Sequence, residues 1–105
     1  MYKAFQKEQF GRETIEQDEG FIVYNYYEDG SLYIHILYVK PEVRNTGIGY
    51  KLEQILIDKY APKEIYCYVD LTSDNPELSM QAILGVGYKV WQSNNEKIVF
   101  KKTME

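Results

Sequence analysis

Cysteine and long apolar runs are scarce in this chain, and each scarcity excludes a class of protein. Cys67 is the only cysteine among 105 residues, so no disulfide can form within the chain and no zinc site can be built from cysteines. No apolar run approaches the roughly 20 residues that cross a bilayer, and residues 1–8 lack the apolar centre of a signal peptide. We therefore expect a cytoplasmic protein with no membrane partner and no metal site.

Basic residues are also too few for one class of partner. The formal net charge is −4, whereas nucleic-acid binding needs a basic surface, so we expect no nucleic-acid partner. An acidic protein instead suits a basic acceptor, such as a lysine-bearing protein surface. The length and the 45% hydrophobic fraction predict one ordinary globular domain over residues 1–105.

Tyrosine is abundant by contrast, with eleven in the chain. It has a high strand propensity, and its polar tip suits half-exposed sheet faces. Most of the tyrosines are therefore explained as strand residues, while a role for one or two of them near a cleft stays open.

Two strands joined by a tight turn are predicted at residues 21–27 and 31–39. Asp29-Gly30 between them is a strong hairpin signal, and so short a loop makes the strands antiparallel. Both faces of the second strand are largely apolar, so we expect it to be central and covered on both sides. Strict alternation places Leu32, Ile34, Ile36 and Tyr38 on one face, and Tyr33, His35, Leu37 and Val39 on the other. Residues 1–20 fit a short strand, a short helix or both.

A helix is predicted over residues 50–60, ended by Pro62. Apolar residues recur at helical spacing on a stripe that should face the sheet: Ile48, Leu52, Ile55 and Leu56. Polar residues are expected mostly on the opposite side: Lys51, Glu53, Gln54 and Asp58.

The rest of the chain predicts a third strand, a short helix and a closing hairpin. The strand at residues 65–69 follows a helical crossover, so it should run parallel to the strand at 31–39. The segment Ser73-Asp74-Asn75-Pro76 is a helix start that contains a capping candidate, ahead of a helix at residues 77–84 with Pro76 in its first turn. The closing hairpin pairs residues 88–92 with 97–101. These elements predict an α+β fold in which two main helices flank a central mixed sheet.

Gly47-Ile48-Gly49, between the second strand and the first helix, is a candidate anion site. Glycines at a helix start leave backbone N–H groups bare at the positive end of the helix, where a phosphate can bind. No Lys-Ser or Lys-Thr follows at Walker spacing, and Leu52 stands where the dinucleotide motif has its third glycine. Taken alone, the motif is better explained as a tight strand-to-helix turn.

The neighbouring residues give this motif a family resemblance. The run strand, Val-x-Pro, Arg-x-x-Gly-x-Gly, helix resembles the acetyl-CoA-binding motif of the GNAT superfamily of N-acetyltransferases, with Val39, Pro41, Arg44, Gly47 and Gly49 at its defining positions. The likeness continues through the strand at 65–69, Asn75 and Gly87-Tyr88, and covers residues 20–101. It implies a GNAT-like mixed sheet in which a hairpin, a β-α-β crossover and a C-terminal hairpin follow in order.

The resemblance implies acetyl-CoA as the cofactor and a set of residues that hold it. Backbone N–H groups of residues 44–49 would bind the pyrophosphate, and the edge at Tyr38 and Val39 would pair with the pantetheine arm where the strands at 31–39 and 65–69 splay apart. An N–H near Val39 would stabilise the oxyanion as an amine attacks the thioester directly, with no covalent enzyme intermediate. The implied cofactor-binding residues are Tyr38, Val39, Arg44, Asn45, Thr46, Gly47, Ile48, Gly49 and Asn75.

Two departures from the family pattern bear on catalysis. The family commonly carries a proton-donating Tyr four residues before the glycine that corresponds to Gly87, and that position holds Ile83. A thiolate can leave without an acid, so this loss slows the transfer without forbidding it. The front of the chain is also too short for the two helices that usually cover the acceptor site. The acceptor side should therefore be open, which favours a protein substrate, or be completed by a second subunit in a homodimer.

Asp70 and His35 are the candidates for the general base. An amine with a pKa near 10 must lose a proton before it attacks, so a carboxylate or imidazole in the cleft is wanted. Asp70 follows the strand that borders the cleft, although an aspartate there also caps loops. His35 is the only histidine, and a packed, hydrogen-bonded strand histidine is its alternative explanation.

The predicted function is acetyl-CoA-dependent transfer of an acetyl group to an amine, of a protein lysine or N-terminus. Ile83 also leaves open a non-catalytic CoA-binding module. A third alternative is an interaction protein that inhibits its target by contact alone.

Overall fold

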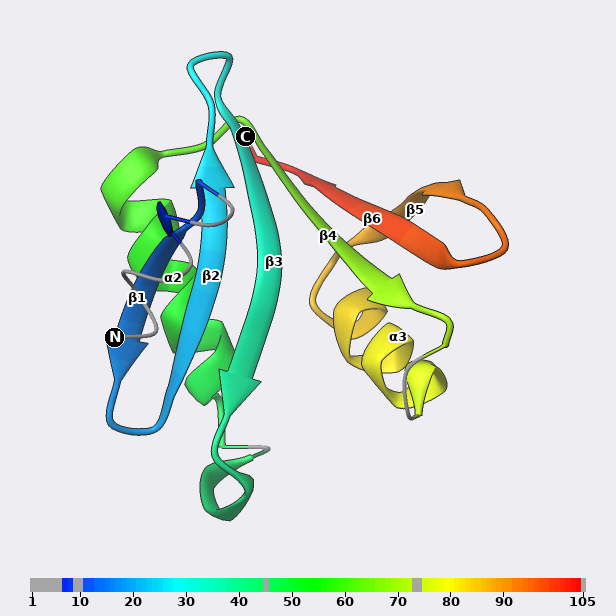
Figure 1. Cartoon of the computed structure of the whole chain (residues 1–105), viewed down its shortest axis with the longest axis horizontal. Helices are drawn as coiled ribbons and strands as arrows, with labels where there is room; N and C mark the ends of the chain where they lie inside the picture. The colour runs from blue at the N-terminus through cyan, green and yellow to red at the C-terminus, as the bar shows by residue number, and fades with distance from the viewer. Residues whose placement is uncertain (1–6, 9–10, 45, 73–74, 105) are drawn as a thin grey trace.

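The computed structural model describes residues 7–8, 11–44, 46–72 and 75–104. Within these residues six strands form one mixed sheet in the order β1-β2-β3-β4-β6-β5 (Figure 1). The strands are β1 (Glu13–Gln17), β2 (Gly20–Tyr26), β3 (Ser31–Val39), β4 (Glu64–Asp70), β5 (Lys89–Ser93) and β6 (Lys97–Thr103). The helices are the 3-10 helix η1 (Pro41–Val43), α2 (Ile48–Tyr60) and α3 (Pro76–Gly85). The predicted α+β mixed sheet is confirmed.

The hairpin of β2 and β3 has the predicted antiparallel pairing and turn. Gly30 adopts the left-handed φ of +91°, and Asp29 Oδ1 accepts a hydrogen bond of 2.9 Å from the Ser31 N–H. The turn therefore needs a glycine for its left-handed backbone and an aspartate to accept this hydrogen bond. Before this hairpin, β1 pairs antiparallel with β2. Residues 1–20, for which the sequence left a strand and a helix open, therefore contain a strand. None of the helices in the described residues is long and apolar enough to span a bilayer.

A β-bulge interrupts the regular alternation of β3. Val23 pairs with Ile36 and Tyr24 with Ile34, so His35 is an extra residue in the ladder. Such an insertion moves every later side chain to the other face. A Cβ on Gly49 of α2 would therefore meet Leu37 at 3.4 Å and Val39 at 3.9 Å. The prediction that Leu37 and Val39 share a face with Tyr33 is wrong.

The sheet divides where β3 meets β4. These strands run parallel, as predicted, but they pair only between residues 31–33 and 64–66. β4 pairs with β6 along its whole length. Beyond the short ladder β3 and β4 diverge, and Figure 1 shows β1, β2 and β3 leading away from β4, β6 and β5. The expected splay is therefore present in the fold.

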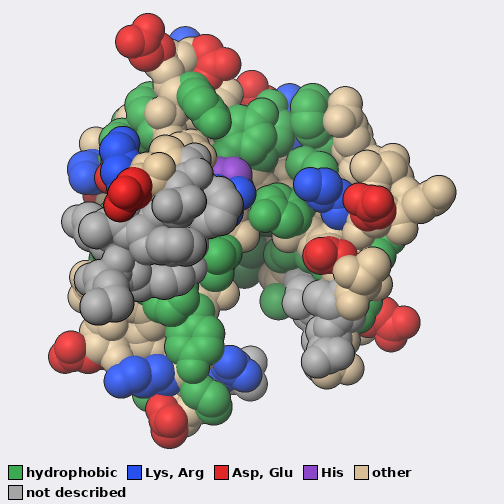
Figure 2. Space-filling model, viewed as in Figure 1, with side chains coloured by type: hydrophobic (Ala, Val, Ile, Leu, Met, Phe, Trp, Pro, Cys, Tyr) green, Lys and Arg blue, Asp and Glu red, His purple; other side chains and the backbone are tan. Residues whose placement is uncertain are grey.

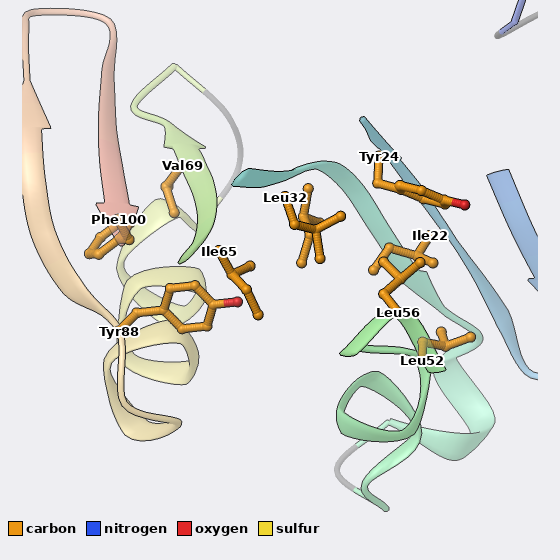
Figure 3. Packing of buried hydrophobic residues seen from close by; sticks show 10 residues of the cluster. Ile22, Tyr24, Leu32, Leu52, Leu56, Ile65, Val69, Tyr88 and Phe100 are labelled. Atoms are coloured by element: carbon orange, nitrogen blue, oxygen red, sulfur yellow. The ribbon is translucent and has the colours of Figure 1, made fainter. Parts of the chain in front are cut away.

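The apolar core lies on one face of the sheet and includes both helices. Leu52 and Leu56 of α2 are buried, as the helical stripe predicts, and Met80 and Ile83 of α3 pack against the same cluster. In Figure 3, Leu32 lies between core residues of the two diverging halves: Ile22, Tyr24, Leu52 and Leu56 on one side, and Ile65, Val69, Tyr88 and Phe100 on the other.

The opposite face of β3 is not fully covered, contrary to the sequence prediction. β3 is an interior strand, and Leu32 and Ile34 are buried on the core face. Tyr33 and His35 on the other face are only partly buried, and Tyr38 at the end of the strand is 39% exposed. Neither α2 nor α3 covers that face, because both pack on the core side.

Candidate functional site

The N-terminus of α2 has an uncapped anion-binding geometry. Gly47 precedes the helix with φ 88° and ψ 8°, and no side chain caps the first turn, which also contains no acidic residue. The first N–H groups of a helix have no partner within the helix, and the helix dipole favours an anion there. A Cβ on Gly47 would meet no atom within 4 Å. The glycine is therefore required by its left-handed backbone and not by a neighbouring protein atom.

Arg44 and Thr46 fold back on the turn that precedes this helix. Arg44 Nε donates a hydrogen bond of 2.9 Å to the Val39 carbonyl oxygen, and its guanidinium carbon lies 5.8 Å from the centre of the Tyr38 ring. The guanidinium has further N–H donors beyond Nε. Thr46 Oγ1 donates to the Val43 carbonyl oxygen. Asn45, which the sequence also places at the cofactor, lies outside the described residues.

A cleft of about 520 Å³ opens where β3 and β4 diverge. It reaches both faces of the sheet, because His35 and Tyr68 line it from the outer face and the α2 and α3 residues from the core face. Figure 2 shows the molecule hollowed between its two halves. The residues that line the cleft and matter below are His35, Leu37, Gly49, Glu53, Cys67, Tyr68, Asp70, Ile83 and Tyr88.

His35, one predicted base, is held as a neutral imidazole. Its Nε2 lies 2.8 Å from Asn25 Oδ1, and an amide oxygen can only accept, so Nε2 carries the hydrogen. Nδ1 is buried without a hydrogen-bond partner among the described residues. Burial, helped by the nearby charges of Arg12 and Lys97, lowers the pKa of His35 to about 4. Its basicity at neutral pH is correspondingly weak.

Asp70, the other predicted base, caps the turn that follows β4. Its Oδ1 accepts hydrogen bonds from the Thr72 N–H at 2.8 Å and from the Thr72 hydroxyl at 2.6 Å. These bonds lower the pKa of the exposed Asp70 carboxyl, and the charge of Lys97 acts in the same direction. Asp70 thus caps the turn, as its alternative explanation predicted. The same residue also lines the cleft.

Glu53 is a cleft residue that the sequence prediction placed wrongly on the solvent side of the helix. It is only 7% exposed, and its Oε1 accepts hydrogen bonds from the Tyr88 hydroxyl at 3.2 Å and from Lys102 Nζ at 2.9 Å. Burial and the Glu53 charge raise the pKa of Tyr88. Gly49 and Glu53 lie four residues apart and so share a face of α2. That spacing is the sequence signal that could have identified Glu53.

Three further predictions concern Cys67, Ile83 and Asn75. Cys67 lines the cleft, and burial together with the Glu53 charge raises the pKa of its thiol to about 12. Ile83, which stands where the resemblance expects a proton-donating Tyr, is part of the cleft wall. Asn75 is the N-cap residue of α3, with a left-handed φ of 53° and no capping hydrogen bond from its side chain. Its predicted contact with the cofactor stays a prediction.

Comparison with known proteins agrees with this geometry. The sequence profile of the "Acetyltransferase (GNAT) family" matches residues 8–80. No curated protein sequence matches the chain significantly.

Solved structures with a similar fold include three acetyltransferases. The PaiA N-acetyltransferase of Thermoplasma acidophilum, solved in complex with coenzyme A, is 18% identical, with a TM-score of 0.71 over 98% of this chain and 68% of its own. The IAA acetyltransferase of Bacillus cereus is 13% identical, with a TM-score of 0.68 over 89% and 78%. An acetyltransferase of Thermus thermophilus is 11% identical, with a TM-score of 0.73 over 89% and 64%. These likenesses show the fold, and the profile match over most of the chain shows the family. The chain belongs to the GNAT acetyltransferase family.

Proposed function

We propose that this protein transfers an acetyl group from acetyl-CoA to an amine of another protein, either a lysine side chain or an N-terminus. The observation that carries the proposal is the cleft between β3 and β4, which connects the uncapped start of α2 with the opposite face of the sheet. Donor and acceptor can then meet in one gap from two sides, as direct attack requires.

The residues present fit acetyl-CoA, which the GNAT family uses as its acetyl donor. The N–H groups that follow Gly47 offer an anion site with no competing carboxylate in the first turn of α2. Past Tyr33, β3 has no ladder with β4, so its edge near Val39 can receive an extended ligand, which would share the Val39 carbonyl oxygen with Arg44 Nε. Arg44, Thr46, Ile48, Gly49 and Asn75 complete the proposed donor site. Bound acetyl-CoA supplies the acetyl group as an activated thioester.

The proposed acceptor side is the sheet face opposite the helices. Four rings cross it in a row, with centroid distances of 5.5 Å between Tyr27 and Tyr33, 4.7 Å between Tyr33 and Tyr66, and 5.0 Å between Tyr66 and Trp91. Tyr27 is 49% and Trp91 46% exposed. Small-molecule sites usually enclose most of their ligand. A row of aromatic rings with exposed ends, whose middle rings Tyr33 and Tyr66 are partly buried and buried, respectively, suits the surface of a protein better.

Proton removal from the acceptor is assigned to Asp70, with His35 as the alternative. Asp70 is ionised at neutral pH, so its charge favours the approach of a protonated amine to the cleft. His35 is neutral at the same pH, so it adds no repulsion beside that amine. Asp70→Asn should lower kcat more than His35→Gln if this assignment is right.

Acetylation of proteins from a cell lysate, measured by mass spectrometry, tests the proposal. We expect new acetyl groups on lysines or N-termini that depend on acetyl-CoA and on this protein. Gly47→Glu should abolish both acetylation and CoA binding, because it introduces a carboxylate at the anion site. Glu42→Gln, in the exposed η1 helix, is the matched control for a change of charge nearby.

Ile83 on the cleft wall favours a second candidate, a CoA-binding protein without transferase activity. An aliphatic side chain can donate no proton to a leaving thiolate. CoA binding by calorimetry together with no acetylated product from proteins, peptides or polyamines would favour this second candidate. A biological effect that survives Gly47→Glu would instead indicate an inhibitor that acts by contact alone.

A further inference from the structure

Glu53 and Tyr88, in the core-facing part of the cleft, form a polar cluster with Lys102 of β6, and the proposed reaction does not use it. Both the Tyr88 hydroxyl and Lys102 Nζ donate to the same Glu53 oxygen, at 3.2 Å and 2.9 Å. The side chains of Glu53 and Lys102 are 9% and 17% exposed. Lys102 Nζ also lies 4.6 Å from the centre of the Tyr88 ring. The cluster is thus a largely buried ion pair with a hydroxyl fixed on it.

The cluster connects the two diverging halves of the sheet. Glu53 comes from α2, which packs on β2 and β3, whereas Lys102 belongs to β6 and Tyr88 precedes β5. In Figure 3 the Tyr88 ring extends from the β5 side, with its hydroxyl directed toward the half that contains Leu52 and Leu56. Glu53 and Tyr88 therefore line the cleft from its two halves, and Lys102 of β6 pairs with Glu53 without being one of the lining residues.

The position of Glu53 on α2 creates an electrostatic problem for the donor site. It lies four residues after Gly49, on the same helix face and about one turn, roughly 6 Å, from the N–H groups proposed to bind the pyrophosphate. A buried carboxylate at that distance repels an anion more strongly than an exposed one, because little water screens it. Lys102 supplies the opposite charge on the same oxygen.

We propose that Lys102 neutralises Glu53 so that the wall of the cleft next to the helix start does not repel CoA. The hydrogen bond from the Tyr88 hydroxyl fixes the position of the Glu53 carboxylate. Lys102 is then a positioning residue for donor binding that acts through Glu53. This proposal rests on the donor site assigned under the proposed function.

Calorimetric titration with CoA, without an acceptor, tests it on the whole chain. Lys102→Met should weaken CoA binding by about tenfold or more, the equivalent of 1.4 kcal/mol. Lys102→Arg keeps the charge and should stay within about threefold of the wild type. The double variant Glu53→Gln with Lys102→Met carries neither charge, so it should recover most of the lost affinity. If Lys102→Met does not fold, Lys102→Gln replaces it in both comparisons.

Lys101→Met is the matched control. Lys101 is the preceding residue of β6 and has its own ion pair, with Glu64, on the outer face beside Tyr66. Its loss changes the net charge by the same amount without touching Glu53, so CoA affinity should stay within about twofold of the wild type.

The outcomes separate this proposal from the one that it rests on. If the wild type does not bind CoA, the proposed donor site itself fails. If the wild type binds and Lys102→Met binds equally well, Lys102 has no role in donor binding. Equal losses in Lys102→Met and in the double variant would also overturn the proposal, because neutralisation predicts recovery. Circular dichroism melts of each variant ensure that affinities are compared on folded protein.

Discussion

Replacing each glycine of the Gly47-Ile48-Gly49 turn by alanine should separate folding from donor binding. Gly47 has a φ of 88°, and a Cβ there meets no atom within 4 Å, so Gly47→Ala adds backbone strain without a clash inside the protein. A left-handed conformation costs an L-residue roughly 1–2 kcal/mol. With a sensitivity of roughly 4–8 °C per kcal/mol for small domains, Tm should fall by several degrees.

Gly49→Ala is the matched variant, and its effect on stability should have the opposite sign. Gly49 lies within α2, and its Cβ would make an ordinary contact of 3.4 Å with Leu37. Alanine is favoured over glycine within a helix by up to about 1 kcal/mol. Gly49→Ala should therefore unfold at the same temperature as the wild type or at a higher one.

Donor binding should distinguish the same two variants. The Gly47 Cβ would project into the open space proposed for the pyrophosphate, so Gly47→Ala should weaken CoA binding by about tenfold or more. The Gly49 Cβ would point toward β3, and Gly49→Ala should keep its affinity within about threefold. Thermal denaturation by circular dichroism and calorimetry with CoA measure the two effects. A Gly47→Ala variant as stable as the wild type would refute the left-handed turn, and unchanged affinity would refute the anion site.

Three other expectations concern the strands around the cleft. Gly20→Ala should lower the free energy of unfolding in urea by about 2–3 kcal/mol, because its Cβ would lie 2.1 Å from the Tyr38 carbonyl oxygen. Gly85→Ala, whose Cβ meets nothing within 4 Å, should have little effect. Equal losses in the two variants would contradict the close packing of Gly20 on β3. His35 has a pKa of about 4 in the folded protein against a usual value near 6.5, so the unfolded chain binds more protons between these values. The contribution of His35 to the free energy of unfolding should then be fully present above pH 6.5, fall by about 2 kcal/mol between pH 7 and pH 5, and stay constant below pH 4. In urea melts His35→Gln should reduce this dependence on pH. An unchanged dependence would show that His35 titrates normally. The Cys67 thiol, with a pKa of about 12, should react with Ellman's reagent at pH 8 at least about a hundredfold more slowly than in the unfolded chain, and a reaction as fast as that of the unfolded chain would exclude the raised pKa.

Features with a local cause could be predicted from the sequence. Asp29 and Gly30 form a tight turn whatever surrounds them, so both flanking strands were predicted almost to the residue. Leu52 and Leu56 recur at helical spacing, and both are buried against the sheet. The family resemblance extended this success to the splay of β3 and β4, because the order of elements specifies the crossover.

Features with a distant cause were missed. The bulge at His35 depends on the register with β2, which no pattern within β3 reveals, and it reverses the faces of Leu37 and Val39. Glu53 looks like a surface residue of an amphipathic helix. It is buried because Lys102, far along the chain, supplies its counter-charge, and a pairing of that kind is invisible to a helical period.

The state of Cys67 supports transfer in a single step under the proposed function. The residue lines the same cleft as Asp70 and Gly49, so its position alone would allow it to take the acetyl group before the amine. A thioester is attacked by thiolate and not by thiol, and burial beside Glu53 raises the pKa of Cys67 to about 12. Lys102 opposes that shift only in part, because its charge is already paired with Glu53. Burial of the sulfur, with the Glu53 charge acting in the same direction, therefore keeps Cys67 protonated at neutral pH, which leaves the amine as the nucleophile.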